Sequence, residues 1–211
     1  MKKRLLLLCT ILALTLSGCG APSEPASENT PAESVPAATE APTPSPTPMP
    51  GTAMFKMGNP ASILLADIAE ESGDAANAWI KVATAFDPEL TVYDVTSMPA
   101  NTIGIAVTFE VEDFDLGEAT LYWCYQLKTA DGTVSVWDTS SPTDTLTITE
   151  DGKYCLVFDA NAALGAPIAQ IESFQMVFPC TTTTATEVEL KSAVCCTTPE
   201  ELTAYTTGKV E

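Results

Sequence analysis

The fold class of this chain is decided by the stretch Thr102-Ile103-Gly104-Ile105-Ala106-Val107-Thr108-Phe109-Glu110-Val111. Every second residue in it is bulky and apolar, beginning with Ile103 and ending with Val111. Successive side chains of a β-strand point to opposite faces, so this period of two predicts a strand with one face in a protein core. The intervening small and polar residues then lie on the other face.

Segments of the same kind recur on both sides of this strand. They are rich in Val, Ile, Thr, Phe and Tyr and cover residues 79–86, 90–95, 119–128, 133–138, 145–149, 154–159, 169–178 and 187–194. The pairs Asp131-Gly132 and Asp151-Gly152 are typical of tight turns between strands. Strands do not alternate with helical patterns, which argues against a parallel α/β sheet. We therefore expect an all-β domain, an antiparallel β-sandwich of the jelly-roll type.

Two short segments carry helix signals. One covers residues 61–70. The other is Thr198-Pro199-Glu200-Glu201, which has the form of an N-cap followed by proline at the first helical position and a capping-box glutamate. We therefore expect a helix near each end of the domain.

The same alternation assigns faces to the other strands. The apolar set predicted to point inward comprises Leu121, Trp123, Tyr125, Leu127, Tyr154, Leu156, Phe158, Phe174, Met176, Phe178, Val188, Leu190 and Val194. The set left on outward faces comprises Tyr122, Gln126, Lys128, Ser135, Trp137, Ser173 and Gln175.

Four of the outward residues form a candidate ligand-binding site: Tyr122, Gln126, Trp137 and Gln175. An aromatic ring can stack on the apolar face of a sugar, and amide groups can hydrogen-bond the sugar hydroxyls. Single exposed aromatic residues are also common on protein surfaces, so an ordinary solvated face is the alternative.

The strand patterns also resemble a known fold family. The run Leu121-Tyr122-Trp123-Cys124-Tyr125, residues 150–158, and residues 171–178 leading to 186–190 look like the last strands of galactose-binding-like jelly rolls. The resemblance spans residues 100–194 and rests on strand patterns, not on an invariant motif. Many carbohydrate-binding modules have this fold, so the resemblance implies a non-catalytic domain that binds carbohydrate or a cell-wall component. An envelope domain for protein interaction or adhesion is the alternative function.

The N-terminus has the pattern of an export signal. Lys2, Lys3 and Arg4 precede an apolar run at residues 5–16 that is shorter than the roughly 20 residues of a membrane-spanning helix. The run ends at Leu16-Ser17-Gly18-Cys19, which resembles a bacterial lipobox. The resemblance implies that residues 1–18 are a signal peptide, and that acyl chains on Cys19 anchor the protein to the extracytoplasmic face of a bacterial cell membrane.

A Pro-rich segment separates this anchor from the strand-rich region. Residues 20–50 consist mainly of Pro, Ser, Thr, Ala and Glu, and every second residue is proline from Pro42 to Pro48. Such a composition cannot bury enough apolar surface to fold, and the prolines favour extended polyproline II structure. We expect a disordered linker over residues 19–52 and a sandwich domain over residues 53–211.

Charge and composition exclude several kinds of partner and chemistry. Removing residues 1–18 leaves 6 Lys and Arg against 28 Asp and Glu, a net charge of 6 − 28 = −22, which disfavours nucleic acid. The chain has no histidine, which excludes Ser-His-Asp and Cys-His nucleophile pairs and histidine metal sites. The acidic run at residues 110–115 lacks the spacing of a calcium-binding EF-hand loop. We expect no enzymatic activity, no cofactor and no bound metal.

Five cysteines remain in the predicted domain: Cys124, Cys155, Cys180, Cys195 and Cys196. An odd number leaves at least one free thiol. Alternation places Cys124 and Cys155 on like faces of their strands, so they are the candidate disulfide. Reduced thiols that pack as small apolar residues are the alternative.

Overall fold

The computed structural model describes residues 50–57, 62–86, 91–137 and 144–211 of the chain. The predicted signal peptide, the predicted lipidation site Cys19 and the predicted linker up to residue 49 lie outside the described residues. No helix in the described part of the chain combines the length and the apolar character needed to cross a membrane. Residues Pro46–Glu211 form one compact unit.

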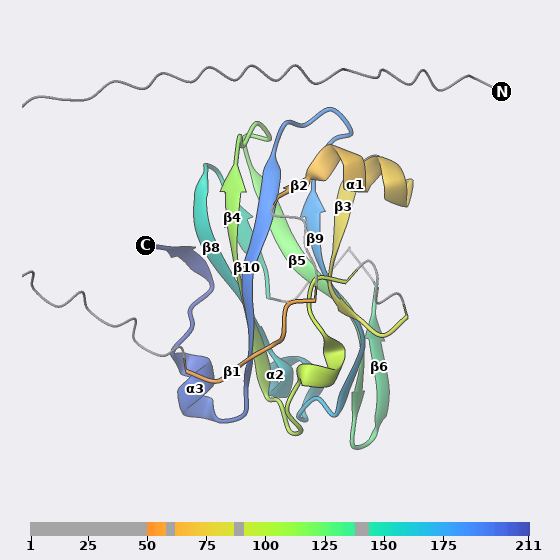
Figure 1. Ribbon diagram of the computed structural model, residues 1–211, viewed down its shortest axis with the longest axis vertical. Helices are drawn as coiled ribbons and strands as arrows, with labels where there is room; N and C mark the ends of the chain where they lie inside the picture. Colours follow the sequence, from red (N-terminus) through yellow and green to blue (C-terminus); the bar gives the residue numbers. More distant parts are fainter. Residues whose placement is uncertain (1–49, 58–61, 87–90, 138–143) are drawn as a thin grey trace, which may run out of the picture. The chain divides into compact units, whose positions relative to one another are not determined.

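Two antiparallel sheets pack face to face as a sandwich (Figure 1). The first, called sheet I below, has the strand order β1-β10-β4-β8-β11, and β2 also pairs with β10. Its middle strand β4 contains most of the period-two stretch at residues 102–111. The strands of sheet I are β1 (Thr52–Ala53), β2 (Ile63–Leu64), β4 (Gly104–Glu112), β8 (Gly152–Asp159), β10 (Glu187–Cys196) and β11 (Gly208–Val210).

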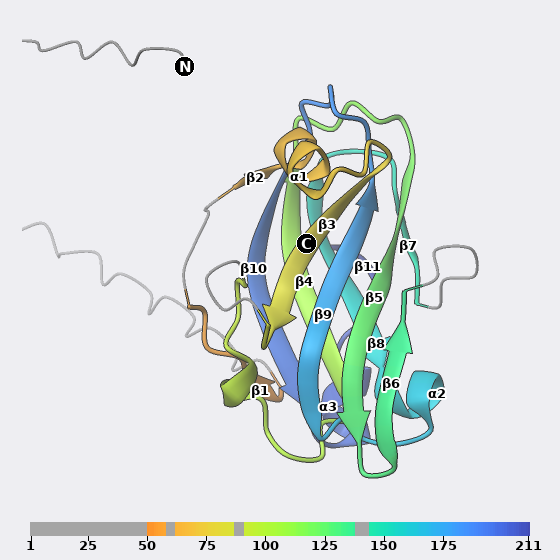
Figure 2. The same ribbon diagram turned by 90° about the vertical axis from the view of Figure 1, so that its right-hand side faces the viewer.

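The second sheet, called sheet II, has the strand order β3-β9-β5-β6, and β7 pairs with the beginning of β5 (Figure 2). The chain passes repeatedly between the two sheets, and its strands interleave in each of them as in a jelly roll. The predicted fold class is therefore confirmed. The strands of sheet II are β3 (Asn77–Thr84), β5 (Ala119–Thr129), β6 (Gly132–Val136), β7 (Leu146–Ile148) and β9 (Gln170–Pro179).

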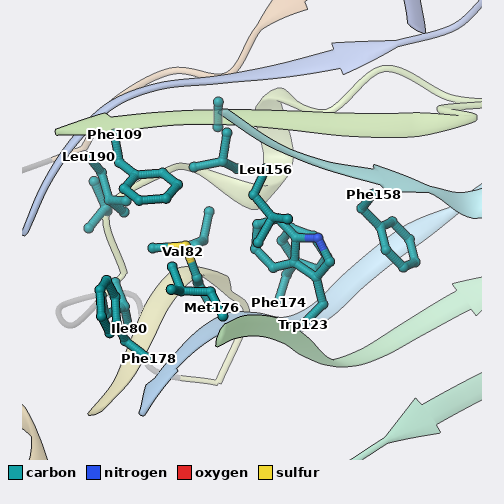
Figure 3. Close-up of a cluster of buried hydrophobic side chains, with 14 of the residues drawn as sticks. Ile80, Val82, Phe109, Trp123, Leu156, Phe158, Phe174, Met176, Phe178 and Leu190 are labelled. Atoms are coloured by element: carbon teal, nitrogen blue, oxygen red, sulfur yellow. The ribbon is translucent and has the colours of Figure 1, made fainter. Parts of the chain in front are cut away.

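The core lies between the sheets and is rich in aromatic rings (Figure 3). Phe174 stacks on Trp123 with ring centroids 4.4 Å apart and meets the edge of Phe158 at 5.4 Å. Phe158 belongs to sheet I, and the other two rings belong to sheet II, so these contacts join the layers. Apart from Val194, every residue assigned to the inward faces of strands 119–128, 154–159, 169–178 and 187–194 is buried in this core.

The prediction for Val194 is wrong because β10 contains a β-bulge. The register with β4 shifts between Leu190 and Ser192, so the alternation changes phase beyond that point. Ala193 and Cys195 then belong to the core, and Val194 lies on the opposite face. Val194 is nevertheless buried, because β1 pairs with β10 next to it.

The helices agree with the sequence in part. The first expected helix, placed at residues 61–70, is observed as α1 (Leu65–Ser72), because residues 63–64 pair with β10. The C-terminal helix α3 (Pro199–Thr203) has the expected capping box between Thr198 and Glu201. Two helical segments were not expected: α2 (Ala160–Leu164), which the Asp159 side chain caps, and η1 (Val95–Ser97). The prediction of a strand at residues 90–95 is wrong for the described residues, in which Tyr93 forms only an isolated bridge with Lys56 before η1 begins.

The C-terminal segment that follows β10 covers part of the outer face of sheet I. Gly104 lets α3 approach closely, since a Cβ atom at this position would lie 2.5 Å from Leu202 Cδ1 and 2.8 Å from the Phe158 carbonyl oxygen. Tyr205 donates a hydrogen bond of 2.6 Å from its hydroxyl to the carbonyl of Pro50. The two ends of the described domain therefore meet on the same side of the sandwich.

Replacing Phe174 by Ala should lower the free energy of unfolding by about 3–5 kcal/mol, because it removes a fully buried ring and leaves a cavity between the sheets. Urea denaturation of residues Pro46–Glu211, followed by far-UV circular dichroism, measures the change. Phe86→Ala is the matched control: this ring is 67% exposed, so the same truncation should change stability by less than about 0.5 kcal/mol. Equal losses in the two variants would contradict the observed core.

Candidate functional site

The candidate site lies on the outer face of sheet II, the face turned away from the core. Gln126 of β5 pairs with Ser173 of β9 on one side and with Ser135 of β6 on the other. Gln175 of β9 pairs with Cys124, one step further along β5. The structure therefore places Gln126 and Gln175 together on one surface, as the strand alternation predicted.

Hydrogen bonds between side chains hold the two amides in place. Gln126 donates from Nε2 to Glu172 Oε2 at 2.6 Å, and Gln175 donates from Nε2 to Ser173 Oγ at 3.0 Å. Glu172 also pairs with Lys128 at 2.8 Å. The hydrogen bond from Lys128, assisted by that from Gln126, holds the pKa of Glu172 below its usual range. Both amides thus have a fixed orientation. The Nε2 atom of each is used in a hydrogen bond, and the Oε1 atom of each takes no part in that bond.

A β-bulge brings Glu172 into this network. The register between β5 and β9 shifts after Gln126, because Gln126 faces Ser173 whereas Leu127 faces Ile171. Glu172 is therefore the extra residue of β9, and its side chain reaches Gln126 and Lys128 on the outer face. Sequence alternation alone would have placed Glu172 on the core side.

The two aromatic residues of the predicted site have different exposures. Trp137 follows β6 directly and is 44% exposed, so its ring is available to a ligand. Tyr122 lies on the outer face as predicted but is only 5% exposed, and it packs with Cys124, Val177 and Trp79. The prediction that Tyr122 is an open stacking surface is therefore wrong in the observed arrangement.

Trp79 is the functional candidate that the sequence analysis missed. It lies on β3 in register with Val177, and its indole nitrogen donates a hydrogen bond of 2.9 Å to Asp74 Oδ2. This bond is the main reason that the pKa of Asp74 is lowered. Alternation along β3 could have found Trp79, because Ala78 and Ile80 on either side of it are buried in the core.

Acidic residues are distributed very unevenly over the two sheets. The strands of sheet II contain one acidic residue, Glu172, and two lysines, Lys81 and Lys128. On a chain with 28 acidic and 9 basic residues, this face is poor in negative charge. The strands of sheet I, by contrast, contain Glu110, Glu112, Asp159, Glu187 and Glu189.

A concave feature lies beside β3. It is an open hollow of about 480 Å³ lined by Met57, Thr84, Ala85, Thr91, Asp94, Val95, Thr96 and Gln170. Its one carboxylate, Asp94, accepts hydrogen bonds from the side chain and backbone of Thr96, which lower its pKa. Because that carboxylate serves a local turn, the hollow offers less specific chemistry than the outer face of sheet II.

Two carboxylates of the acidic run at residues 110–115 have partners within the protein, and Glu110 pairs with Lys191 at 2.7 Å. Asp115 accepts hydrogen bonds from the Thr184 hydroxyl, from the Thr186 hydroxyl at 3.0 Å and from the Ala185 backbone at 2.9 Å. In the described ranges, no three His, Cys, Asp or Glu side chains gather in a way that could hold a metal ion.

The structure contradicts the predicted Cys124–Cys155 disulfide, because neither cysteine forms a disulfide and both side chains are buried. Cys124 lies on the outer face of sheet II. Cys155 lies between the core residues Tyr154 and Leu156, and therefore faces the outer side of sheet I. Stacked sheets are about 10 Å apart, and a disulfide requires Cα atoms within about 7 Å. Like faces of two strands are not adjacent faces when the strands belong to opposite sheets.

The remaining described cysteines, Cys180, Cys195 and Cys196, are also free and buried. Burial raises the pKa of Cys195 to about 12 and that of Cys196 to about 11. Because the thiolate is the nucleophile, these groups are unreactive at neutral pH.

The native domain should therefore react very slowly with the thiol reagent DTNB at neutral pH. After unfolding in guanidinium chloride without reductant, all five thiols should titrate. Absorbance at the thionitrobenzoate band measures both reactions. A total of three thiols after unfolding would indicate one disulfide and would contradict the structure.

A half-buried carboxylate lies close to the edge of the sandwich. Burial raises the pKa of Asp144, and the charge of Asp159 raises it further. Asp144 also has φ +52°, in the left-handed region that asparagine tolerates well. Its folded-state pKa exceeds the value in the unfolded chain, so protonation stabilises the fold, and this stabilisation is lost as pH rises through the folded-state pKa.

Asp144→Asn should consequently raise the melting temperature at pH 7, because it removes the cost of a charged, half-buried group. The difference from the parent protein should disappear below about pH 4, where the aspartate is protonated in both states. Thermal unfolding at a series of pH values measures this. A variant that is less stable than the parent at pH 7 would show that the Asp144 charge is favourable.

The chain matches no protein-family model, and comparisons with curated proteins and with solved structures found no similar protein. The established result is the fold, an antiparallel two-sheet β-sandwich.

Proposed function

We propose that this chain is a membrane-anchored extracytoplasmic lipoprotein with a non-catalytic β-sandwich domain that binds carbohydrate or a cell-wall component. The binding surface is the outer face of sheet II. One arrangement carries the proposal: Trp137 is exposed and directly follows β6, where strand alternation assigns its ring to the face that bears the amides of Gln126 and Gln175. The resemblance to galactose-binding-like jelly rolls supports the same function.

The chemistry of the face suits a sugar. A pyranose ring has an apolar surface of C–H groups and a rim of hydroxyls that both donate and accept hydrogen bonds. Trp137 supplies a flat apolar ring, and the amide oxygens of Gln126 and Gln175 are acceptors for sugar hydroxyls. The contacts with Glu172 and Ser173 hold these amides in position before a ligand arrives, which lowers the entropy cost of binding.

The predicted anchor places this domain where such ligands occur. An acylated Cys19 would hold the protein to the outside of the cell membrane, and a linker of about 30 residues would reach at most roughly 90 Å from it. At this distance the domain can contact the polymers of a cell wall.

Protein recognition is the second candidate function, and a different surface supports it. Phe55, Met57 and Phe86 are 69%, 48% and 67% exposed. Met57 lines the hollow beside β3, and Phe86 follows directly after Ala85, another residue of its lining. Exposed apolar clusters of this kind often mark contacts with protein partners.

Trp137→Ala should weaken glycan binding at least tenfold, which corresponds to about 1.4 kcal/mol for the loss of a stacking ring. Isothermal titration calorimetry of residues Pro46–Glu211 with soluble peptidoglycan fragments and neutral glucan oligosaccharides measures the affinity. Phe86→Ala removes an exposed aromatic ring outside the proposed site and should leave the affinity unchanged.

Two outcomes would redirect the proposal. If only Phe86→Ala weakened glycan binding, the site would belong to the hollow beside β3. If no glycan bound at all while a protein from a cell-envelope extract bound through Phe55 and Phe86, the second candidate function would replace the first.

A further inference from the structure

We infer that the ligand of the outer face of sheet II is an uncharged linear glycan of several sugar units that lies across the strands, between Trp79 and Trp137. This inference rests on the proposed function. It adds the charge class of the ligand, its minimum length and its direction on the sheet.

The two tryptophans lie at opposite edges of the sheet. Trp79 is on β3, and Trp137 directly follows β6, with β9 and β5 between these two strands (Figure 2). Trp79 is level with Val177 of β9, and Val177 with Tyr122 of β5. Val136 pairs with Tyr125, so Trp137 continues β6 towards the level of Cys124. The two indole rings therefore differ by only about one alternation step along the strand direction.

The spacing of the strands sets the length of the ligand. Three intervals of about 4.8 Å separate β3 from β6, which gives roughly 14 Å between the two edges. One sugar ring is too short to contact both tryptophans, whereas about three linked rings cover such a span. Gln175 lies on this path at the level of Cys124, and Gln126 lies one alternation step further along β5, so their amides are hydrogen-bonding groups on and beside the path.

Trp79 is held as a platform and is not a mobile side chain. Trp79 packs against the buried cluster of Tyr122, Cys124 and Val177, and the residue as a whole is half-buried. The hydrogen bond from its indole nitrogen to Asp74 fixes the rotation of the ring. A ring that is held in place and still partly exposed is suited to stacking.

The charged residues of sheet II and the net charge of the chain favour an uncharged ligand. The one acidic residue on the strands of sheet II, Glu172, already pairs with Lys128, so the face offers no spare carboxylate to a cationic sugar. An anionic polymer would be repelled by a chain whose net charge is −19, or −22 without residues 1–18 by the count 6 − 28. Beside Lys81, which pairs in register with Gln175, the face consists of amides, hydroxyls and aromatic rings, which suit neutral hydroxyl-rich chains.

A length series tests the inference. Calorimetry with the binding glycan at one to six sugar units should show no measurable affinity for the monosaccharide, a rise up to about three or four units and a plateau beyond them. Neutral oligosaccharides should bind more tightly than uronic-acid or amino-sugar oligomers of the same length.

Substitutions at the two tryptophans test the contribution of each ring separately. Trp79→Ala and Trp137→Ala should each weaken binding of the hexasaccharide at least tenfold, and Trp79→Phe, which keeps an aromatic ring, should lose less. Asp74→Ala frees the Trp79 ring and should weaken the hexasaccharide while leaving the disaccharide nearly unchanged. Phe86→Ala is the control with no expected effect. Circular dichroism of each variant confirms that the sandwich is intact.

The possible outcomes test separately the length of the ligand, its charge class and the proposed function. A monosaccharide that binds as tightly as the hexasaccharide would overturn the across-strand chain and indicate recognition of a single sugar. Tighter binding of charged oligomers would overturn the charge class. In both cases the proposed carbohydrate-binding function would stand. The absence of binding to any glycan would overturn the inference and the proposed function together.

Discussion

Phe174 contacts Trp123 on a neighbouring strand of its own sheet and Phe158 on the opposite sheet. These contacts fix which side of β5, β8 and β9 faces the core. In a β-strand a slip of one residue would turn every side chain to the other face, so the same contacts decide which residues face outward. The positions of Gln126 and Gln175 on the outer face are thus a consequence of the aromatic packing beneath them.

Strand alternation was sufficient to predict the fold class, most of the core and the face that carries the candidate site. It succeeds for strands such as β4, because a period of two in bulky residues has one structural interpretation. It fails where the period is interrupted: the bulge in β10 moves Val194 out of the core, and the bulge in β9 brings Glu172 to the outer face. A bulge depends on the partner strand, which a local pattern does not reveal.

Two other errors have a common cause. Tyr122 points outward yet is buried by its neighbours on the same face, and Cys124 and Cys155 have like orientations yet belong to different sheets. Alternation describes a strand relative to its own sheet only. Exposure depends on the residues that lie above a face, and the distance between two thiols depends on topology. For Trp79, by contrast, alternation within its own strand is enough. Its neighbours Ala78 and Ile80 are buried in the core, so Trp79 faces outward.

The hydrogen bond between Tyr205 and the Pro50 carbonyl has a mechanical consequence. Pro50 is the point at which the predicted stalk enters the domain, and Tyr205 belongs to the segment that covers sheet I. Tension on the tether therefore reaches two parts of the fold, the short pairing of β1 with β10 and the C-terminal segment, before it reaches the core. Under the proposed attachment through residues 19–52, the load is therefore borne first by the edge of sheet I and by the segment that covers it.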